Sequence, residues 1–423
     1  MRILYVLHQF FPEFHGGTER VTLNLARMAQ RAGHYVHVLA CTVEPDKCGG
    51  VLSAEPVAGS YAATFEGLPV SLLPRSRLPA AADISLDVDA QLVESLSEWM
   101  RGEQFDVAHV MHTMRMGSAV AALQRCGLPY VLTLTDFFLP CARVNLINAQ
   151  NQQCQGPQGG RNCSRDCHVP PWTPVGLSNR FAQSQAILQA AGARVAPSDY
   201  VAHCYRQAYP EPQVQVQVIA HGIDLLAMGV ALQVAGPAPR SYAGLNLIFI
   251  GSLVPQKGLE VLLRALALLP GAQVRLKVIG GFFGDPIYQR TIRKLADADP
   301  RVELAGAKEA AQVFQALTQS DVLCIPSLVP ESYSLVFHES AAAGVPALVS
   351  DLGAPAQQVE ARACGRVVAA GDVSAWAKAI DSLVRHPDSI ASWKDKLFLP
   401  LRIEEEAFFY ESIYKRLRLQ DRP

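Results

Sequence analysis

The sequence has no excess of charge of either sign. Its 423 residues contain 37 Lys and Arg against 38 Asp and Glu, which gives a formal net charge of −1. This balance argues against a nucleic-acid-binding protein held by a basic surface and against a polybasic membrane anchor. It leaves room for a small local anion-binding pocket.

Long hydrophobic runs are also missing. The apolar run at residues 3–7 is too short for the core of a secretory signal, and the mostly apolar stretch 245–254 is too short to span a bilayer. We therefore expect a cytoplasmic protein whose ten cysteines stay reduced, with the cytosolic membrane face as an alternative place of action. No basic amphipathic helix stands out to support that alternative.

What the sequence does contain is enough apolar residues for a large core. Half of the chain is apolar and 18% is charged, which excludes global disorder. At this length the chain is expected to form two or three domains.

The N-terminal half begins with a β-turn-α-β pattern. Residues 3–7 and 35–40 are continuous apolar runs, typical of strands buried on both faces of a parallel sheet. Between them, a Gly-rich turn at 15–18 leads into a helical pattern over 19–32, which ends at Gly33. The pattern predicts the start of a doubly wound sheet.

A second strand-helix series starts near residue 247, after a stretch at 225–243 that is typical of a linker. We predict an α/β protein with two Rossmann-like, doubly wound domains facing a central cleft. The predicted domains are 1–225, with a Cys-rich insertion at about 140–170, and 244–395. A C-terminal helix at 400–420 is expected to pack back across the domain junction.

The most informative segment, residues 327–346, follows a predicted buried strand and opens a helix. Free amides at such a helix start favour an anion. Glu331 before the helix and Glu339 within it would lie roughly 10 Å apart at a rise of about 1.5 Å per residue. That arrangement suits a ligand with hydroxyl groups at both ends and phosphates between them, as in a nucleoside diphosphate sugar. The spacing is equally compatible with an ordinary helix that has one Glu near its start and one on an exposed face.

Two weaker motifs accompany this segment. The turn 251–258 directly follows a strand, where Gly251 allows close backbone approach and Lys257 offers a point charge for phosphate. Gly16 and Gly17 occupy the first strand-to-helix turn, where glycine lets a ligand approach the amides. Either turn by itself is more often purely structural.

Together, these motifs and the Ala343-Gly344-Val345-Pro346 run make the chain similar to the retaining family-4 glycosyltransferases of GT-B architecture. The resemblance covers nearly the whole chain. It implies a hexosyltransferase-type enzyme of class EC 2.4 that takes a sugar from a nucleotide-sugar donor and uses no catalytic metal. It also implies front-face attack, in which a donor phosphate oxygen takes the proton of the acceptor.

The resemblance also implies residue roles. Glu331 would bind hydroxyls of the donor sugar, Glu339 the ribose, and Lys257 the diphosphate leaving group. The implied catalytic residues are Glu331, Lys257, Thr135 and Asp136. The implied donor-binding residues are Gly16, Gly17, Gly251, Ser252, Lys257, Glu331, Ser332, Tyr333, Ser334, Leu335 and Glu339.

Two positions depart from the family pattern. Ser252 stands where many members have an Arg that pairs with the Lys on the diphosphate. Thr135 stands where many have a His that contacts the donor sugar. His109 and His112 follow a neighbouring strand and either line the same cleft or, as we prefer, are structural or surface residues.

An addition to the family pattern is a loop-rich stretch with four cysteines. Cys141, Cys154, Cys163 and Cys167, with His168 beside the last, could hold a structural zinc ion in place of regular structure. An iron–sulfur cluster and free or redox thiols are the alternatives. The other cysteines are expected to be small core residues.

The predicted function is therefore transfer of a sugar from a nucleotide-sugar donor to a hydroxyl acceptor in glycan, polysaccharide or glycolipid biosynthesis. A UDP-sugar is preferred over a GDP-sugar as the donor. The acceptor is unknown from the sequence, and a lipid-linked glycan at the membrane face is one candidate. Two alternatives stay open. They are a nucleotide-sugar epimerase or hydrolase of the same fold, and a non-catalytic nucleotide-sugar-binding protein.

Overall fold

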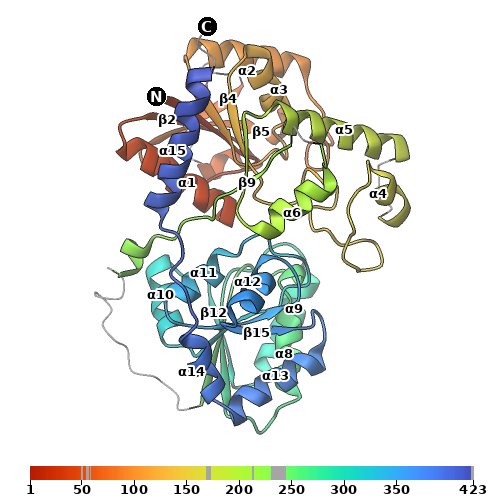
Figure 1. The fold of residues 1–423 in the computed structure, drawn as a ribbon, viewed down its shortest axis with the longest axis vertical. Helices are drawn as coiled ribbons and strands as arrows, with labels where there is room; N and C mark the ends of the chain where they lie inside the picture. Colours follow the sequence, from red (N-terminus) through yellow and green to blue (C-terminus); the bar gives the residue numbers. More distant parts are fainter. Residues whose placement is uncertain are drawn as a thin grey trace. The chain divides into compact units, whose positions relative to one another are not determined.

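The structure is a computed structural model. It describes residues 1–48, 51–53, 57, 59–167, 173–211, 214–229 and 244–420 (Figure 1). The chain divides into two compact units. The first unit comprises Met1–Gly222 and Ile403–Pro423, and the second comprises Ile223–Arg402. Most of the predicted linker 225–243 lies outside the described residues.

In the described part of the first unit, the strands form one sheet in the order β3-β4-β5-β2-β1-β6-β7-β8-β9. All neighbours pair in parallel except β3 with β4 and β4 with β5. The strands are β1 (Arg2–Val6), β2 (Tyr35–Thr42), β3 (Val51–Ser53), β4 (Ser60–Phe65), β5 (Leu68–Pro74), β6 (Val107–Val110), β7 (Tyr130–Thr133), β8 (Ala193–Ala196) and β9 (Gln217–Val218). The helices are α1 (Gly17–Arg31), α2 (Ala90–Gly102), α3 (Gly117–Cys126), α4 (Arg161–Asp166), α5 (Pro174–Ala190), α6 (Asp199–Ala208) and α15 (Ile403–Gln420).

The second unit holds an all-parallel sheet in the order β12-β11-β10-β13-β14-β15. Its strands are β10 (Leu245–Ile250), β11 (Val274–Ile279), β12 (Val302–Gly306), β13 (Val322–Ile325), β14 (Ala347–Ser350) and β15 (Gly365–Val368). Its helices are α8 (Leu259–Ala267), α9 (Pro286–Asp297), α10 (Ala310–Thr318), α11 (Leu335–Ala342), α12 (Ala354–Arg362), α13 (Val373–Arg385) and α14 (Asp388–Lys394). The predicted α/β class with two Rossmann-like domains is confirmed, and the first sheet is parallel except at its β3-β4-β5 edge.

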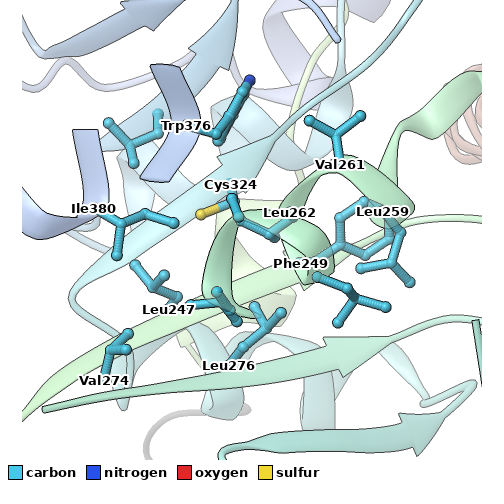
Figure 2. Packing of buried hydrophobic residues seen from close by; sticks show 14 of the residues in the cluster. Leu247, Phe249, Leu259, Val261, Leu262, Val274, Leu276, Cys324, Trp376 and Ile380 are labelled. Carbon is cyan, nitrogen blue, oxygen red and sulfur yellow. The ribbon is translucent and has the colours of Figure 1, made fainter. Parts of the chain in front are cut away.

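Apolar side chains bury both faces of the second sheet, as the continuous apolar runs predicted. On one face, Leu247 and Phe249 of β10 pack in a cluster with Leu262 and Trp376 (Figure 2). On the other face, the intervening residue Ile248 packs in a separate cluster. Because successive side chains of a strand point to opposite faces, a run without alternation requires helices on both sides.

The antiparallel edge of the first sheet was not predicted. The exposure of β4 alternates between buried or half-buried and exposed positions. Such a solvated edge does not produce the continuous apolar run that identifies a strand buried on both faces. The strand β15 was missed as well, and in it only Val368 is fully buried.

The C-terminal helix α15 belongs to the first unit and packs beside α1 (Figure 1). Beneath it lies a buried polar network. Tyr414 OH lies 2.6 Å from His109 Nδ1 and 3.3 Å from Tyr5 OH, while Thr133 Oγ1 lies 2.7 Å from His109 Nε2 and 2.8 Å from Tyr410 OH. Burial lowers the pKa of His109 to about 3, so the ring is neutral. His109 is thus a structural residue under α15.

None of the helices among the described residues is both long enough and apolar enough to cross a bilayer.

Candidate functional site

The loop that follows β13 brings a carboxylate and an ammonium group together. Lys257 Nζ donates to Glu331 Oε1 at 2.7 Å, and Ser327 Oγ donates to the same oxygen at 2.5 Å. Burial by itself would raise the pKa of Glu331, but the charge of Lys257 and the two hydrogen bonds hold it below its ordinary value. Glu331 is therefore an ionised carboxylate, and its side chain is 12% exposed.

A glycine turn makes this contact possible. Gly258, after the short 3-10 helix Pro255–Lys257, has φ +69°, and a Cβ there would overlap the Pro326 carbonyl oxygen. Leu328 N also donates to Gln256 O at 2.8 Å. The turn after β10 therefore packs directly on the loop after β13, which sets Lys257 beside Glu331. The neighbouring Ser252 is exposed.

A second glycine holds the backbone of Glu331. Gly353 has φ +81° and forms a parallel bridge with Glu331, and Ala354 N donates to Glu331 O at 2.8 Å. A Cβ at Gly353 would overlap the backbone nitrogen and oxygen of Glu331. The loop after β14 thus supports the loop after β13, so the carboxylate is positioned from two sides.

The helix α11 starts from an unusual backbone conformation. Ser334 precedes it with φ +67° and ψ +88°, a left-handed conformation that costs a non-glycine residue about 1–3 kcal/mol. His338 stabilises this turn, because its Nδ1 lies 3.0 Å from Ser334 O and its ring stacks on Tyr333 at 3.9 Å. Such strain is concentrated at functional sites, and the first turn of a helix presents amides without intrahelical partners. His338 was not among the predicted site residues. The signal that could have found it is its position on the predicted helix, five residues after Tyr333.

Glu339 lies on α11 and is only 6% exposed. The alternative interpretation, in which Glu339 lies on an exposed face of an ordinary helix, is therefore wrong. The structure brings Lys257, Ser327, Glu331 and the start of α11 together in the second unit.

In the first unit, the predicted residues gather at the carboxyl end of the sheet. Gly16 and Gly17 are exposed at the start of α1. Thr135 is 8% exposed, and its hydroxyl donates to Met111 O at 3.1 Å, which ties the end of β7 to the end of β6. Asp136 is more accessible, with a side chain that is 31% exposed. Asp136 is therefore better placed than Thr135 to meet a ligand.

The predicted zinc site is not supported. Among the described residues, no group of three or more His, Cys, Asp or Glu side chains is arranged to hold a metal ion. Cys141, Cys154, Cys163 and Cys167 are free thiols, and His168 lies outside the described residues. Burial and the nearby thiols Cys141, Cys167 and Cys154 raise the pKa of Cys163 to about 12.

Hydrogen bonds stabilise the Cys-rich loop instead. The buried guanidinium of Arg180 donates to Leu139 O at 3.0 Å, to Ile84 O at 2.8 Å and to Phe138 O. Within the loop, Asn162 Nδ2 donates to Gly156 O at 2.8 Å. Cys163 packs with Ala142 and Leu177 as a small apolar residue.

Two family models match the chain in adjoining regions. The model "Glycosyltransferase Family 4" matches residues 15–225, and "Glycosyl transferases group 1" matches residues 244–386. This chain belongs to the family-4, group 1 glycosyltransferases. The second of the two matches contains Lys257, Glu331 and Glu339, and the first contains Asp136.

Curated relatives of this glycosyltransferase chain match it in part. A phosphatidyl-myo-inositol mannosyltransferase of Mycobacterium leprae is 31% identical over 199 residues, which are 46% of this chain and 50% of the relative. A D-inositol 3-phosphate glycosyltransferase of Mycobacterium marinum is 34% identical over 179 residues, or 38% of this chain and 37% of the relative. The chain thus spans about half or less of the length of these relatives.

Solved structures match the glycosyltransferase chain over its full length. Sucrose-phosphate synthase from Thermosynechococcus elongatus has a TM-score of 0.69 at 17% identity and covers 99% of this chain and 100% of its own. Anabaena HepE in complex with UDP-glucose has a TM-score of 0.63 at 16% identity and covers 99% of each chain. At these identities the similarity establishes the fold, which is GT-B.

Proposed function

We propose that this protein is a retaining glycosyltransferase that moves a sugar from a nucleotide-sugar donor to a hydroxyl group of an acceptor. The observation that carries the proposal is the hydrogen-bonded group of Lys257, Glu331 and Ser327 beside the first turn of α11. It combines a cation, a carboxylate and helix amides, which are the chemistry required by a diphosphate that is flanked by hydroxyl-bearing rings.

Each group has one task in this proposal. An ammonium group has three N–H donors, so Lys257 can keep its bond to Glu331 and still donate to a phosphate oxygen. The first amides of α11, together with the segment Ser332 to Leu335, receive the phosphates. Glu331, held ionised, accepts hydrogen bonds from hydroxyls of the donor sugar, and Glu339 accepts those of the ribose.

The reaction forms a bond between the acceptor oxygen and the anomeric carbon of the sugar and breaks the bond from that carbon to the diphosphate. The acceptor proton passes to an oxygen of the departing diphosphate. Lys257 and the helix amides stabilise the negative charge that develops there, which accelerates the reaction. We expect no step to require a metal ion.

Uracil is the proposed nucleobase of the donor. HepE, a protein of this fold, binds UDP-glucose, which supports UDP over GDP. The names of the curated relatives describe inositol-type acceptors, which supports a polyol or sugar hydroxyl as the acceptor here. Such an acceptor can be free or carried by a lipid.

The test is thermal unfolding of the whole protein with excess UDP, GDP, ADP and dTDP. A nucleotide at about a hundred times its dissociation constant stabilises the folded state by about 2.7 kcal/mol, which raises Tm by a few degrees. We expect UDP to give the largest shift and Glu339→Ala to reduce it. The matched control is Glu360→Ala, which removes an exposed Glu on α12.

An absence of any shift would contradict the proposal and favour a non-catalytic protein, with Ser252 in place of an Arg as the physical reason. Release of free sugar or an epimer from UDP-glucose without an added acceptor would instead favour a hydrolase or epimerase.

A further inference from the structure

Three side chains with functional chemistry follow neighbouring strands of the first unit. His8 comes after β1, His112 after β6 and Asp136 after β7, and β6 pairs with both β1 and β7. The pair β1–β6 is where the strand order reverses direction, since β2 lies on the other side of β1. In open α/β sheets, ligands bind outside the carboxyl ends of the strands at this switch point.

The hydrogen bonds of His112 determine its tautomer. Met114 N donates to His112 Nδ1 at 3.1 Å, so this nitrogen carries no proton. The proton therefore resides on Nε2, which donates to Asp136 Oδ2 at 2.6 Å. The side chain of His112 is only 4% exposed, and both of its nitrogens are engaged. His112 can thus hold Asp136 but has no further polar atom with which to meet a ligand.

Asp136 is held from two sides and remains open to solvent. Its Oδ1 accepts from Phe138 N at 2.9 Å, and Oδ2 accepts from His112. Tyr205 OH donates to the main-chain oxygen of the same residue at 3.0 Å. A carboxylate offers about four lone-pair sites, so two remain for a ligand. Because the side chain is 31% exposed, a ligand can reach them.

A buried pair lies behind His112. The ring of His8 packs on the ring of His112 with centroids 3.9 Å apart, and His8 Nε2 lies 3.8 Å from Glu19 Oε1. Burial raises the pKa of Glu19 and lowers that of His8 well below its ordinary value, so burial disfavours the charged form of both groups.

Among the described residues, His8 Nδ1 and Glu19 Oε1 belong to the few buried polar atoms without a hydrogen-bond partner. Glu19 is 1% exposed, and leaving such an atom unpaired costs about 1–3 kcal/mol.

We propose that Asp136 binds a hydroxyl of the acceptor and that His112 is a positioning residue that holds this carboxylate in place. The assignment rests on the glycosyltransferase function proposed above. A carboxylate accepts hydrogen bonds and repels anions, so this subsite takes a neutral sugar or polyol ring and disfavours a phosphate group at the same place. The nearby cation Arg115 donates from Nε to Asp83 Oδ1 at 2.5 Å, while its buried Nη1 has no hydrogen-bond partner among the described residues.

The experiment uses matched substitutions at one position. The side chain of His112→Gln can present an amide donor near the position of Nε2, while that of His112→Asn is too short to reach Asp136. Transfer from UDP-glucose is measured to glucose, mannose and myo-inositol, each free and as a monophosphate. We expect Asp136→Asn to lower kcat/KM for the acceptor about a hundredfold and His112→Asn about tenfold. His112→Gln should stay within about threefold of the wild type.

Two further measurements separate positioning from loss of structure. The UDP-induced shift in Tm should be unchanged in all three variants, because the proposed nucleotide site lies in the second unit. The double variant His112→Asn, Asp136→Asn should be no slower than Asp136→Asn, because His112 acts through Asp136. Asp136→Asn should also lower the wild type's preference for the neutral acceptors over their monophosphates.

Wild-type acceptor kinetics in His112→Asn or in Asp136→Asn would overturn this assignment while leaving the proposed function in place. So would a wild-type preference for the monophosphates. If the wild-type protein neither responds to nucleotides nor transfers sugar, the proposed function fails and this assignment fails with it.

Discussion

The two units build their candidate sites in different ways. In the second unit, Ser327, Glu331 and the start of α11 come from one continuous segment, and Lys257 reaches it through one glycine turn. In the first unit, His8, Glu19, His112 and Asp136 come from four separated places in the chain. The parallel pairing of β1, β6 and β7 brings His8, His112 and Asp136 together, and α1 adds Glu19.

The two sites also treat charge differently. The second unit pairs an ionised carboxylate with an ammonium group, whereas the first unit buries groups whose charged forms are disfavoured. This difference follows from the partner: a nearby opposite charge stabilises ionisation, and burial without such a charge suppresses it. A site that contains the cation Lys257 fits a diphosphate, whereas a site whose accessible group is the Asp136 carboxylate fits hydroxyl groups.

The largest expected effect tests the charged site. Glu331→Ala should lower kcat by about a hundredfold to a thousandfold, because the proposed contact of Glu331 is to the reacting sugar and because Lys257 loses its partner. Steady-state kinetics with UDP-glucose measure this, with Glu360→Ala as the control for an exposed Glu in the same unit. Full turnover in Glu331→Ala would remove Glu331 from the site.

The next effect tests the backbone support of that site. Gly353→Ala introduces a Cβ that overlaps Glu331 and a side chain at φ +81°, so we expect a loss of about 1–3 kcal/mol in the stability of the second unit, together with lower activity. Gly271→Ala is the matched control, since a Cβ there meets no atom within 4 Å. Calorimetric unfolding of the two variants makes the comparison. Equal Tm values would show that the loop can move aside.

Acid should weaken the first unit before the second. The pKa of His109 is lowered to about 3 from an ordinary value of 6.5, so between these values the unfolded chain binds a proton that the folded unit does not. Stability therefore falls as pH drops below 6.5, by about 2 kcal/mol at pH 5 for this one group. The pKa values of Asp299 and Glu331 in the second unit are lowered, so these carboxylates stay ionised over this range.

Hydrogen exchange of the whole protein at pH 7.5 and pH 5 resolves the two units. We expect protection to fall in peptides from β1, β6, β7 and α15 and to persist in β10, β11 and β13. His109→Gln, which stays uncharged, should flatten the pH dependence. An equal loss of protection in both units would contradict the prediction that acid destabilises the first unit before the second.

The smallest expected effect concerns the affinity of the second unit for the donor phosphates. Ser252→Arg adds an exposed cation at the turn that carries Lys257, where the family resemblance implies a second phosphate contact. A charge-assisted contact of about 1 kcal/mol corresponds to a roughly fivefold tighter UDP complex. Calorimetric titration measures it, with Ser252→Gln as the uncharged control. Unchanged affinity would place residue 252 away from the phosphates.

Sequence patterns predicted the fold class and the segment that we propose binds the donor. Continuous apolar runs require helices on both faces of a sheet, and the runs at 3–7 and 35–40 predicted β1 and β2 with slightly different bounds. The strand-turn-helix context of residues 327–346 singled out Glu331 and Glu339 because that motif is local, and their roles in donor binding stay a prediction. The zinc site was not supported, since the spacing of cysteines does not specify the distances between sulfur atoms.

Which polar residues come into contact depends on the folded structure and could not be predicted from the sequence. Thr135 and Asp136 are adjacent in sequence. The Thr135 hydroxyl is hydrogen-bonded within the fold, whereas the Asp136 side chain stays accessible. His109 and His112 are close in the sequence, yet His109 contacts α15 and His112 holds Asp136. The physical reason is that strand register and helix packing set which side chains touch, and these depend on pairings between residues far apart in the chain.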